Sequence, residues 1–431
     1  MIGFSMIKYP SPQVPTYAPT LTDINNLGQI TGYVQLDTFN TTGLIYDMPT
    51  ATFVKLNSTG IIIPLGISNN GTVSGVSVQG FVFTLSSPFI YFNNAFKFIN
   101  VGPISSRITP RAINNNGQIV GEYLLSGSIP ASAGIGPLHG LVSDGISYST
   151  LDNPSAVTNT ASPGINDGTT LTGVNDKGDI VGTYLGADNN THSFVYTAGA
   201  FIDIADPAAT AATHVNSINN KGDMVGWFTQ GTRQRMFYYS GGYFANFDIG
   251  TGDGQATGLN DLGQVVGNAG GAFVTAPFAH LNSDYRFFDS ATGDHFYTTS
   301  ATEAAGVRAT LPSYHDEGAP WSTPDKGAGT TDVYRFFDTA TGAHFLTASA
   351  AERDQVMATQ RTYQFEGVAF EAYLAAGEGS LTLGRFYNTQ THLHHYAASA
   401  AESASILGGG AGPGWVSEGA GPIVHMTGSS G

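Results

Sequence analysis

Apolar and polar residues alternate around a short polar phrase that returns six times in the first 280 residues. The copies are INNLGQITGYV (24–34), ISNNGTVSGVS (67–77), INNNGQIVGEY (113–123), VNDKGDIVGTY (174–184), INNKGDMVGWF (218–228) and LNDLGQVVGNA (259–269). Asn or Asp followed by Gly supplies the positive-φ positions of a tight hairpin, and the alternation after it buries one face of a strand. The pattern therefore favours a scaffolding turn over six repeated ligand sites.

The turn glycines of the six copies lie 41 to 61 residues apart, a period typical of propellers and solenoids. Two more strands follow a copy, as in HSFVYTAG (192–199) and AFIDIADP (200–207), which makes the four strands of a propeller blade. The sixth copy has only a third strand, GAFVTAP (271–277), whereas GFSMIKYP (3–10) at the N-terminus is unassigned. We predict a six-bladed β-propeller over residues 1–279, closed by the N-terminal strand so that no edge stays exposed.

Each copy also contains a second glycine within its alternating segment. A glycine inside a strand predicts a place where another backbone or sheet approaches closely. The repeated phrase resembles the HAF-repeat family of predicted extracellular bacterial proteins, over residues 1–279. This resemblance implies a propeller-like exported domain and brings no activity with it.

A different pattern begins after this region and occurs three times, with repeat lengths of 49 and 50 residues. The copies are YRFFDSATGDHFYTTSATE (285–303), YRFFDTATGAHFLTASAAE (334–352) and GRFYNTQTHLHHYAASAAE (384–402). Each reads as a β-hairpin followed by an S-A-x-E segment, in which Ser caps one helical turn and Glu lies in that turn. We predict that residues 280–431 form an all-β, β-trefoil-like domain with pseudo-threefold symmetry.

The alternation within each hairpin separates two faces. In the first hairpin Phe287 and Phe296 form an apolar face, which we expect in the core, whereas the opposite face combines an arginine, a histidine and aromatic rings. The third copy departs from this pattern, because His395 stands where the others have Phe. Aromatic rings with forked hydrogen-bond donors suit a sugar, and three weak sites around one axis would gain by avidity.

The predicted carbohydrate-binding residues are Arg286, His295, Tyr297, Trp321, Arg335, His344, Arg385, Tyr387, His394, Tyr396 and Trp415. A second interpretation stays open, in which Arg, His and Glu at fixed spacing form a buried ion-pair network that closes each lobe. The three copies also resemble a domain family of unknown function with the motif R-F-[FY]-[DN]-x-x-T-G-x-H-F-Y-T. That family occurs in secreted bacterial and fungal proteins, and the resemblance implies an accessory, surface or glycan-binding role.

The net charge of the chain limits the classes of partner that it can bind. Sixteen Lys and Arg against 32 Asp and Glu give a formal net charge of −16. A phosphate backbone and an anionic membrane surface would both be repelled. No apolar run is long enough to cross a bilayer. We expect no nucleic-acid partner and no membrane insertion, and the sequence leaves the oligomeric state open.

Cysteine is absent, which excludes disulfides, thiol catalysis and cysteine-ligated metals. Glycine occurs 56 times and charged residues make up 11% of the chain, a composition that resembles bacterial exported proteins. We therefore expect an extracellular or cell-surface location. The N-terminal segment MIGFSMIKYP (1–10) lacks the charged start and the apolar stretch of a signal peptide, so the export route is not visible.

Candidate chemistry is sparse. The chain has no H-E-x-x-H, G-x-S-x-G or P-loop pattern. Acidic turns such as NDKGD (175–179) suggest calcium, but they lack a spaced set of carboxylates and fit hairpin turns better. The segment THLHHY (391–396) offers His392, His394 and His395 to a metal, although the repeat already explains His394. We expect no cofactor and no metal.

We predict a non-catalytic carbohydrate-binding protein, a lectin or adhesin whose partners are glycans. The first alternative is a glycan hydrolase or lyase with its site in the propeller, since a propeller brings distant carboxylates together. Asp144, Asp203 and Asp248 are possible members of such a site. The second alternative is a structural surface protein.

Overall fold

The computed structural model describes residues 3–10, 18–37, 40–56, 60–78, 86–99, 105–125, 137–157, 168–377 and 379–429. The chain divides into two compact units, which are described separately. The first comprises Met1–Tyr239 and Ala245–Phe278, and the second comprises Ser240–Phe244 and Ala279–Ser430.

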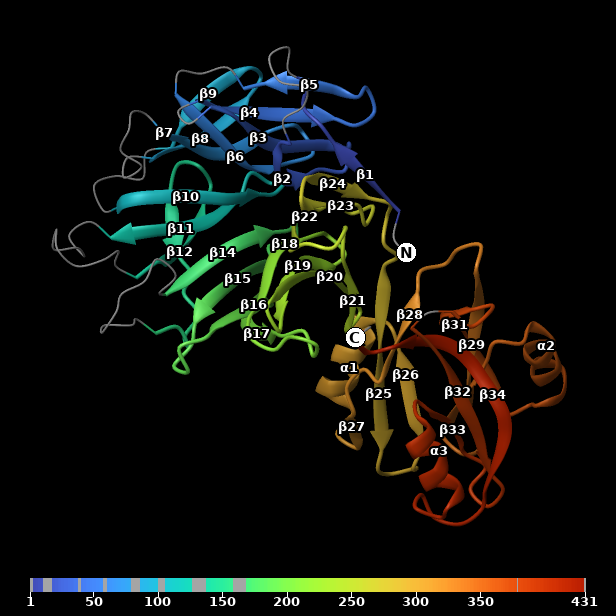
Figure 1. Ribbon diagram of the computed structural model, residues 1–431. Coiled ribbons are helices and arrows are strands. Elements are labelled where there is room, and N and C mark those ends of the chain that lie inside the picture. The colour runs from blue at the N-terminus through green and yellow to red at the C-terminus, as the bar shows by residue number, and fades with distance from the viewer. Residues whose placement is uncertain are drawn as a thin grey trace. The chain divides into compact units, whose positions relative to one another are not determined.

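The first unit is a six-bladed β-propeller, as predicted, with four strands in each blade (Figure 1). Blade one contains β2 (Thr20–Ile24), β3 (Gln29–Asp37), β4 (Asn40–Asp47) and β5 (Thr52–Lys55). Blade two contains β6 (Ile61–Ile67), β7 (Val73–Val78), β8 (Ser86–Phe92) and β9 (Ala95–Phe98). Blade three contains β10 (Ser105–Ile113), β11 (Ile119–Leu125), β12 (His139–Ser143) and β13 (Tyr148–Thr150). Blade four contains β14 (Thr169–Val174), β15 (Ile180–Leu185), β16 (Thr191–Thr197) and β17 (Ala200–Ile204), and blade five contains β18 (Thr213–Ile218), β19 (Met224–Gln230), β20 (Arg233–Ser240) and β21 (Tyr243–Phe247).

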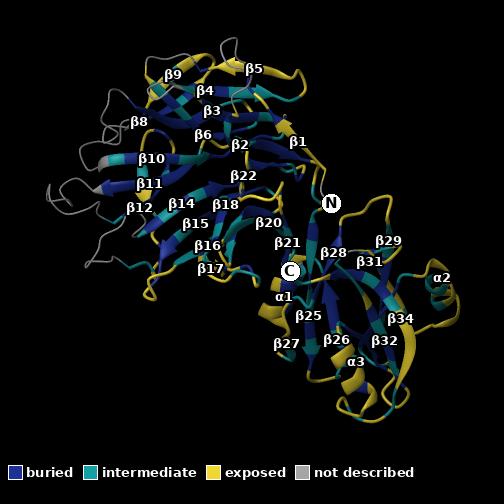
Figure 2. Ribbon diagram, viewed as in Figure 1, coloured by how far each residue is buried: buried dark blue, intermediate teal, exposed yellow. Residues whose placement is uncertain are grey.

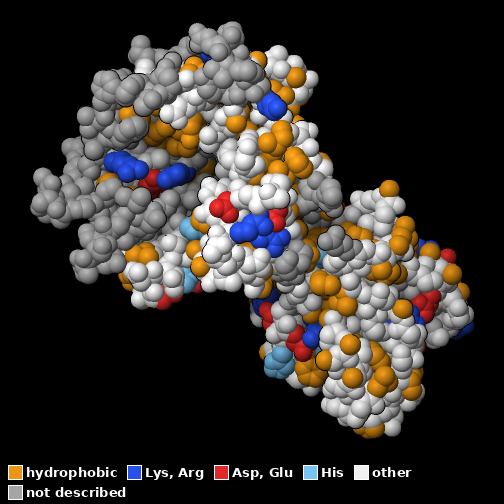
Figure 3. All heavy atoms as spheres, in the orientation of Figure 1, with side chains coloured by type: hydrophobic (Ala, Val, Ile, Leu, Met, Phe, Trp, Pro, Cys, Tyr) orange, Lys and Arg blue, Asp and Glu red, His pale blue; other side chains and the backbone are white. Residues whose placement is uncertain are grey.

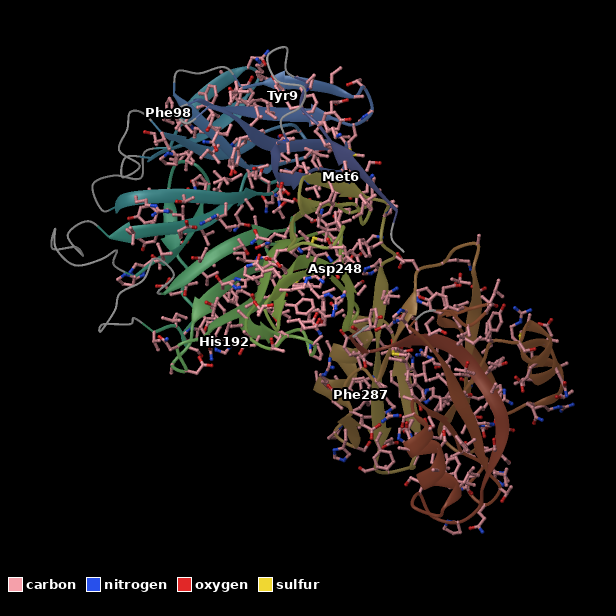
Figure 4. All side chains as sticks on the ribbon, in the orientation of Figure 1. Met6, Tyr9, Phe98, His192, Asp248 and Phe287 are labelled. Atoms are coloured by element: carbon pink, nitrogen blue, oxygen red, sulfur yellow. The ribbon has the colours of Figure 1, made fainter. Side chains whose placement is uncertain are left out.

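The sixth blade confirms the predicted closure. It contains β22 (Gln255–Leu259), β23 (Val265–Asn268) and β24 (Ala272–Thr275), and its outermost strand is β1 (Phe4–Ile7) from the N-terminus. Strands β1 and β24 are antiparallel, and Met6, labelled in Figure 4, lies opposite Phe273. The N-terminal strand thus covers the edge that the last blade would otherwise expose.

Burial increases from the outer strands of the propeller toward its axis (Figure 2). All residues of β7 are buried, whereas the outermost strand β9 of the same blade is mostly exposed. Residues buried between neighbouring blades form the cores, as where Val120 of β11 packs with Leu171 and Phe194 of blade four. Apolar packing between blades therefore holds the propeller together, and the outer edges contribute little.

The second glycine of each copy allows a β-bulge in the innermost strand. In blade five the pairing of β18 with β19 skips one residue between Val215 and Ser217, and Gly226 lies opposite Val215. A Cβ atom on Gly226 would collide with the carbonyl oxygen of His214. The same collision occurs at Gly32, Gly75, Gly121, Gly182 and Gly267. The predicted close backbone approach is confirmed in all six blades.

The second unit repeats a hairpin, a helix and a long strand three times. The first copy contains β25 (Leu281–Asp289), β26 (His295–Thr298), α1 (Ala301–Thr310), β27 (Tyr314–Asp316) and β28 (Trp321–Pro324). The second and third copies contain β29 (Thr330–Asp338), β30 (Ala343–Thr347), α2 (Ala350–Thr359), β31 (Tyr363–Tyr373); β32 (Ser380–Asn388), β33 (His394–Ala397), α3 (Ala400–Leu407) and β34 (Trp415–Met426), and β35 (Gly428–Ser429) follows.

The structure does not show the predicted β-trefoil in this unit. Ten strands form one sheet instead, in the order β26-β25-β28-β34-β31-β29-β30, with β27, β32 and β33 joined to its side. The reason lies in the strand after each helix, which pairs back on the first strand of its own copy and also meets the corresponding strand of another copy. These long strands join the three hairpins edge to edge, so the hairpins do not close separate lobes.

Each helix begins as its sequence predicts. Ser300 is the N-cap of α1, and its side chain accepts a hydrogen bond from the backbone N–H of Glu303. Ser349 and Ser399 cap α2 and α3 in the same way. The helices are eight to ten residues long rather than the single turn expected. No helix in the described part of the chain has the length and apolar character needed to span a membrane.

The surface of the protein reflects its composition. Uncharged side chains cover most of the face shown in Figure 3, and the few acidic and basic groups lie mostly next to each other. Inside the second unit, Phe287 (Figure 4) packs with Phe296, Ala304 and Val307 between the first hairpin and α1. The prediction that Phe287 and Phe296 form a core face is confirmed.

Candidate functional site: the propeller channel

The innermost strands of all six blades enclose a cavity of about 350 Å³ in the propeller. This volume lies at the lower end of the range of small-molecule sites, roughly 300–1,000 Å³. Asparagine and threonine side chains dominate its lining, and only two aromatic residues, Tyr33 and Trp227, reach it within the described part of the chain.

The β-bulges aim six side chains into this cavity. Each bulge adds one residue that is unpaired in the strand ladder, and its side chain turns toward the axis. The six residues are Thr22, Leu65, Arg111, Thr172, Asn216 and Thr257, and all of them line the cavity. The bulge that the second glycine permits is therefore the local device that gives the channel its polar lining.

Three of these bulge residues also link neighbouring blades. Thr172 Oγ1 donates to the carbonyl oxygen of Val215 at 2.8 Å, and Asn216 Nδ2 donates to that of Ala256 at 2.7 Å. Thr257 Oγ1 donates to the carbonyl oxygen of Leu21 at 3.1 Å, which ties blade six to blade one. Part of the channel's polarity is therefore structural.

One end of the cavity is closed by the repeated asparagine turns. The side-chain amide of the first Asn in a copy donates, at 2.9–3.2 Å, to the backbone carbonyl of the equivalent residue in the next blade. These bonds run Asn25 to Ser68, Asn114 to Asn175, Asn175 to Asn219, Asn219 to Asn260 and Asn260 to Asn25. Copy two has Ser68, which carries no amide, so the bond from blade two to blade three is missing.

A second ring uses the next residue of each copy. Its backbone N–H donates to the side-chain oxygen of the equivalent residue in the following blade at 2.6–2.8 Å. The members are Asn26, Asn69, Asn115, Asp176, Asn220 and Asp261, and the ring closes without a gap. The repeated phrase holds the blades together, which is the scaffolding role that its pattern favours.

Three lining residues of the cavity occupy the position after the second glycine, which differs between copies. This position is Tyr33, Val76, Glu122, Thr183, Trp227 and Asn268, and Tyr33, Trp227 and Asn268 line the cavity. Trp227 stacks on His214 with ring centroids 3.9 Å apart and an interplanar angle of 11°. Burial lowers the pKa of His214 to about 4, so the imidazole is neutral at pH 7. Trp227 therefore has a fixed, uncharged support behind its ring.

Two ionisable side chains outside the asparagine rings, Arg111 and Asp23, line the cavity. Arg111 binds the buried Glu122 through two hydrogen bonds of 2.8 and 2.9 Å. The carboxylate of Asp23 accepts the backbone N–H groups of Ile24 and of Ile67 in the next blade, both at 2.9 Å. Burial raises the pKa of Asp23 to about 7 against the opposing effect of these bonds. Both side chains are thus bound to protein groups.

The carboxylates considered for a hydrolase do not line this cavity. Asp144 accepts the N–H groups of Ile146 and Ser147 in an exposed turn, and these bonds lower its pKa. Asp203 accepts from Tyr184 Oη, and Asp248 (Figure 4) pairs with Arg235 at 3.1 Å. The three lie in three different blades and are not brought together at the channel.

The turn suggested for calcium is part of the asparagine rings. In NDKGD (175–179) the Asp176 carboxylate accepts hydrogen bonds from the side-chain amides of Asn115 and Asn220. Asp179 accepts hydrogen bonds from Asn175 and Thr197. Within the described residues no group of three or more His, Cys, Asp or Glu side chains has the arrangement of a metal site.

The second unit assembles six of the predicted site residues into one repeated network. Arg335 binds Glu366 of its own copy at 2.7 Å and Glu303 of the first copy at 2.9 Å. The same two-way pairing joins Arg385 to Glu418 and Glu352, and Arg286 to Glu317 and Glu402, all at 2.8 Å. Arginine of each copy thus binds the helix Glu of another, and the three links close a cycle. This arrangement is the network of Arg and Glu ion pairs that the sequence leaves open as the alternative to sugar binding.

The three histidines flank this cycle. His295, His344 and His394 have Nε2 atoms 3.4, 3.9 and 3.6 Å from the glutamate after the helix of their own copy. His344 Nδ1 also lies 2.7 Å from the buried Asp294. The three imidazoles are largely buried, between 9% and 16% exposed at the side chain, so little of each ring is open to a ligand.

The remaining predicted residues lie in two settings. Tyr297, Trp321 and Tyr396 are fully buried in the central core of the unit, where Trp321 Nε1 donates to Asp284 at 2.8 Å. Tyr387 binds His392, and the half-buried Trp415 donates to the carbonyl oxygen of Ala411 at 3.1 Å. The sugar-binding role of the eleven residues stays a prediction.

The sequence-based prediction missed the channel residues. One signal was present, because the position after the second glycine changes from copy to copy although the glycine before it is constant. In a closed ring, a variable position next to a constant one indicates that the copies have different roles there. The bulge residues lack such a signal, since a bulge is a feature of the strand pairing.

Comparison with known proteins gives one family match. Residues 283–424 match the family described as Domain of unknown function (DUF5648). This match covers the three copies of the second unit. The HAF-repeat resemblance of the propeller stays a prediction. A search of curated proteins found no match.

Solved structures share limited similarity with the chain. A gluconolactonase of Xanthomonas campestris is 10% identical with a TM-score of 0.38, covering 61% of this chain and 86% of that chain. A Trypanosoma rangeli sialidase is 8% identical with a TM-score of 0.35, covering 63% and 56%. Aleuria aurantia lectin in complex with Fucalpha1-6GlcNAc is 12% identical with a TM-score of 0.30, covering 70% and 95%. Similarities this weak carry no argument about function.

Proposed function

We propose that the protein is a non-catalytic glycan-binding protein and that the propeller channel is its binding site. The observation that carries the proposal is Trp227, stacked on His214, in the lining of a cavity rich in asparagine. A sugar presents an apolar C–H face to an aromatic ring and hydroxyl groups to nearby donors and acceptors. Cell-surface or extracellular glycans are the partners expected from the composition.

The lining of the channel provides both kinds of contact. One face of Trp227 packs on His214, so the ring is held in place and loses little freedom when a ligand binds. Asn268 also lines the cavity, and its side chain is oriented by hydrogen bonds of 3.0 Å with both the N–H and the carbonyl of Leu21. A preorganised ring and a preorganised amide are typical of a binding site for an uncharged polar ligand.

Binding is favoured over hydrolysis because each carboxyl group among the described lining residues is already hydrogen-bonded to protein groups. Hydrolysis requires one carboxyl as acid and a second as base or nucleophile, roughly 5–9.5 Å apart. Asp23 already accepts two backbone N–H groups. Among the described lining residues the other carboxylates are Asp176 and Asp261, which the asparagine ring holds in place.

A glycan array on the full-length protein tests the proposal. We expect saturable binding without release of reducing sugar, and a loss of at least tenfold in affinity for Trp227→Ala. Trp415→Ala is the matched control, because Trp415 is also half-buried but belongs to the second unit. Binding lost only in Trp415→Ala would place the site in the second unit. Turnover of a bound glycan would favour the hydrolase alternative.

A further inference from the structure

The third link of the arginine–glutamate cycle differs from the other two. Between copies one and two, Phe296 packs on His344 with ring centroids 5.0 Å apart. Between copies two and three, Phe345 packs on His394 at 4.7 Å. The equivalent contact between copies three and one joins two imidazoles, those of His395 and His295, at 4.4 Å. Because the third copy has His395 in place of Phe, a pair of histidines stands where the other two links have a contact between Phe and His.

The two imidazoles face each other through one nitrogen each. His395 Nδ1 lies 3.2 Å from His295 Nδ1. The other nitrogen of each ring faces a carboxylate, with His395 Nε2 2.9 Å from Glu402 and His295 Nε2 3.4 Å from Glu317. Carboxylate partners place the ring protons on Nε2. In this tautomer both Nδ1 atoms present lone pairs to each other, and a cation bound between them would stabilise the pair.

We propose that His295 and His395 bind one divalent transition-metal ion, such as Zn²⁺, through their Nδ1 atoms. The separation of 3.2 Å fits two ligands of one tetrahedral zinc, which stand about 3.3 Å apart when each Zn–N bond is about 2.0–2.1 Å. Glu402 and Glu317 take the role of outer partners that orient ligating histidines. Their two negative charges exceed the single positive charge of Arg286, so the site attracts a cation.

The site supplies two protein ligands and is therefore an open one. No third His, Cys, Asp or Glu completes a metal-binding group within the described residues. Water or a donor group of a bound molecule would fill the remaining positions, as in sites that keep an open coordination position. Imidazole ligands suit zinc, copper and nickel, whereas calcium and magnesium prefer oxygen.

Calorimetric titration of the metal-free full-length protein with Zn²⁺ tests the proposal. We expect one ion per chain and a rise in the melting temperature with zinc. His395→Phe is the decisive variant, because it restores the residue of the other two links and is expected to fold. It should weaken zinc binding at least tenfold and abolish the thermal shift. His392→Ala, which removes an exposed histidine of the same segment, should bind zinc like the wild type.

A crystal of the zinc complex locates the ion independently. An anomalous peak between the Nδ1 atoms of His295 and His395 is the expected result. Absence of saturable binding, equal affinity in His395→Phe, or a peak at another place overturns the proposal. None of these outcomes depends on glycan binding, so the metal site and the proposed function fail or stand separately.

Discussion

The two units of this protein link their repeated copies through different kinds of interaction. In the propeller, each copy reaches the next through hydrogen bonds from a backbone N–H to the side-chain oxygen of an Asn or Asp, and six copies close a ring. In the second unit, each copy reaches another through an arginine that binds two glutamates, and three copies close a cycle. In both units one copy departs from the rule, at Ser68 and at His395.

This difference between hydrogen bonds and ion pairs predicts how the stability of each unit responds to salt and pH. Most of the propeller hydrogen bonds join uncharged amide groups, with Asp176 and Asp261 as the charged members, so salt and pH should affect them less than ion pairs. Partly exposed ion pairs are screened by salt and depend on ionised carboxylates. We therefore expect the second unit to be the part of the protein whose stability changes with solution conditions, and the following experiments test that contrast.

The largest effect is expected at the bulge glycine Gly226. Replacing it with Ala would drive a Cβ into the carbonyl oxygen of His214, and neither backbone can move without breaking the bulge. We expect Gly226→Ala to lower the free energy of unfolding of the propeller by about 3–5 kcal/mol. Gly252→Ala is the control, because nothing lies within 4 Å of its added Cβ. Thermal melts of both variants decide, and equal melting temperatures would contradict the bulge argument.

A second large effect concerns Asp284 in the core of the second unit. Burial raises the pKa of this carboxyl to about 7, although a hydrogen bond from Trp321 and the charge of Arg335 oppose the rise. The folded state therefore holds a proton that the unfolded state releases near pH 4. The contribution of Asp284 to stability should be full below about pH 4 and fall by about 3–4 kcal/mol as the pH rises to 7.

Asp284→Asn removes this titration and should flatten the fall. Denaturant unfolding between pH 4 and 7 measures both slopes. A wild type whose stability rises over this interval would show that the carboxyl is ionised in the folded protein.

A smaller loss is expected when the cycle is cut at Arg335. Arg335→Met leaves Glu303 and Glu366 without their shared cation, and we expect the second unit to lose about 2–3 kcal/mol. The difference from wild type should shrink at high salt, because screening weakens the intact pairs. Arg353→Met, which removes a partly exposed arginine paired with its neighbour Asp354 and packed on Tyr334, should change stability little. Equal losses in the two variants would argue against a closed cycle.

The smallest effect is a gain at Ser68. Asn at this position would supply the missing amide to the carbonyl of Asn114, and one added hydrogen bond should stabilise the propeller by about 1 kcal/mol. Asn219→Ser makes the reverse change at an intact link and should cost a similar amount or more. Opposite shifts in melting temperature are expected, and a loss in Ser68→Asn would mean that blade two is adapted to its serine.

The propeller was largely predictable because its pattern is local. Two glycines at fixed spacing set the hairpin turn and the bulge, and the missing fourth strand of the last copy pointed to closure by Phe4–Ile7. The second unit was less predictable. Its hairpins and capped helices follow local signals. The strands Tyr363–Tyr373 and Trp415–Met426 share a glutamate-glycine step, but this step does not reveal which strands they pair with, and their pairing decides that a continuous sheet forms instead of a trefoil.

The sequence by itself determined the repeats, their turns and the faces of each hairpin, because these depend on neighbouring residues and on the two-residue period of a strand. Only the tertiary structure decided which polar groups meet. Asn25 bonds to Asn260 across 235 residues, and His395 meets His295 across 100. Such contacts depend on how the copies close into rings. Ring closure depends on the rotation between each copy and the next, added over all copies, and no single stretch of sequence specifies that total.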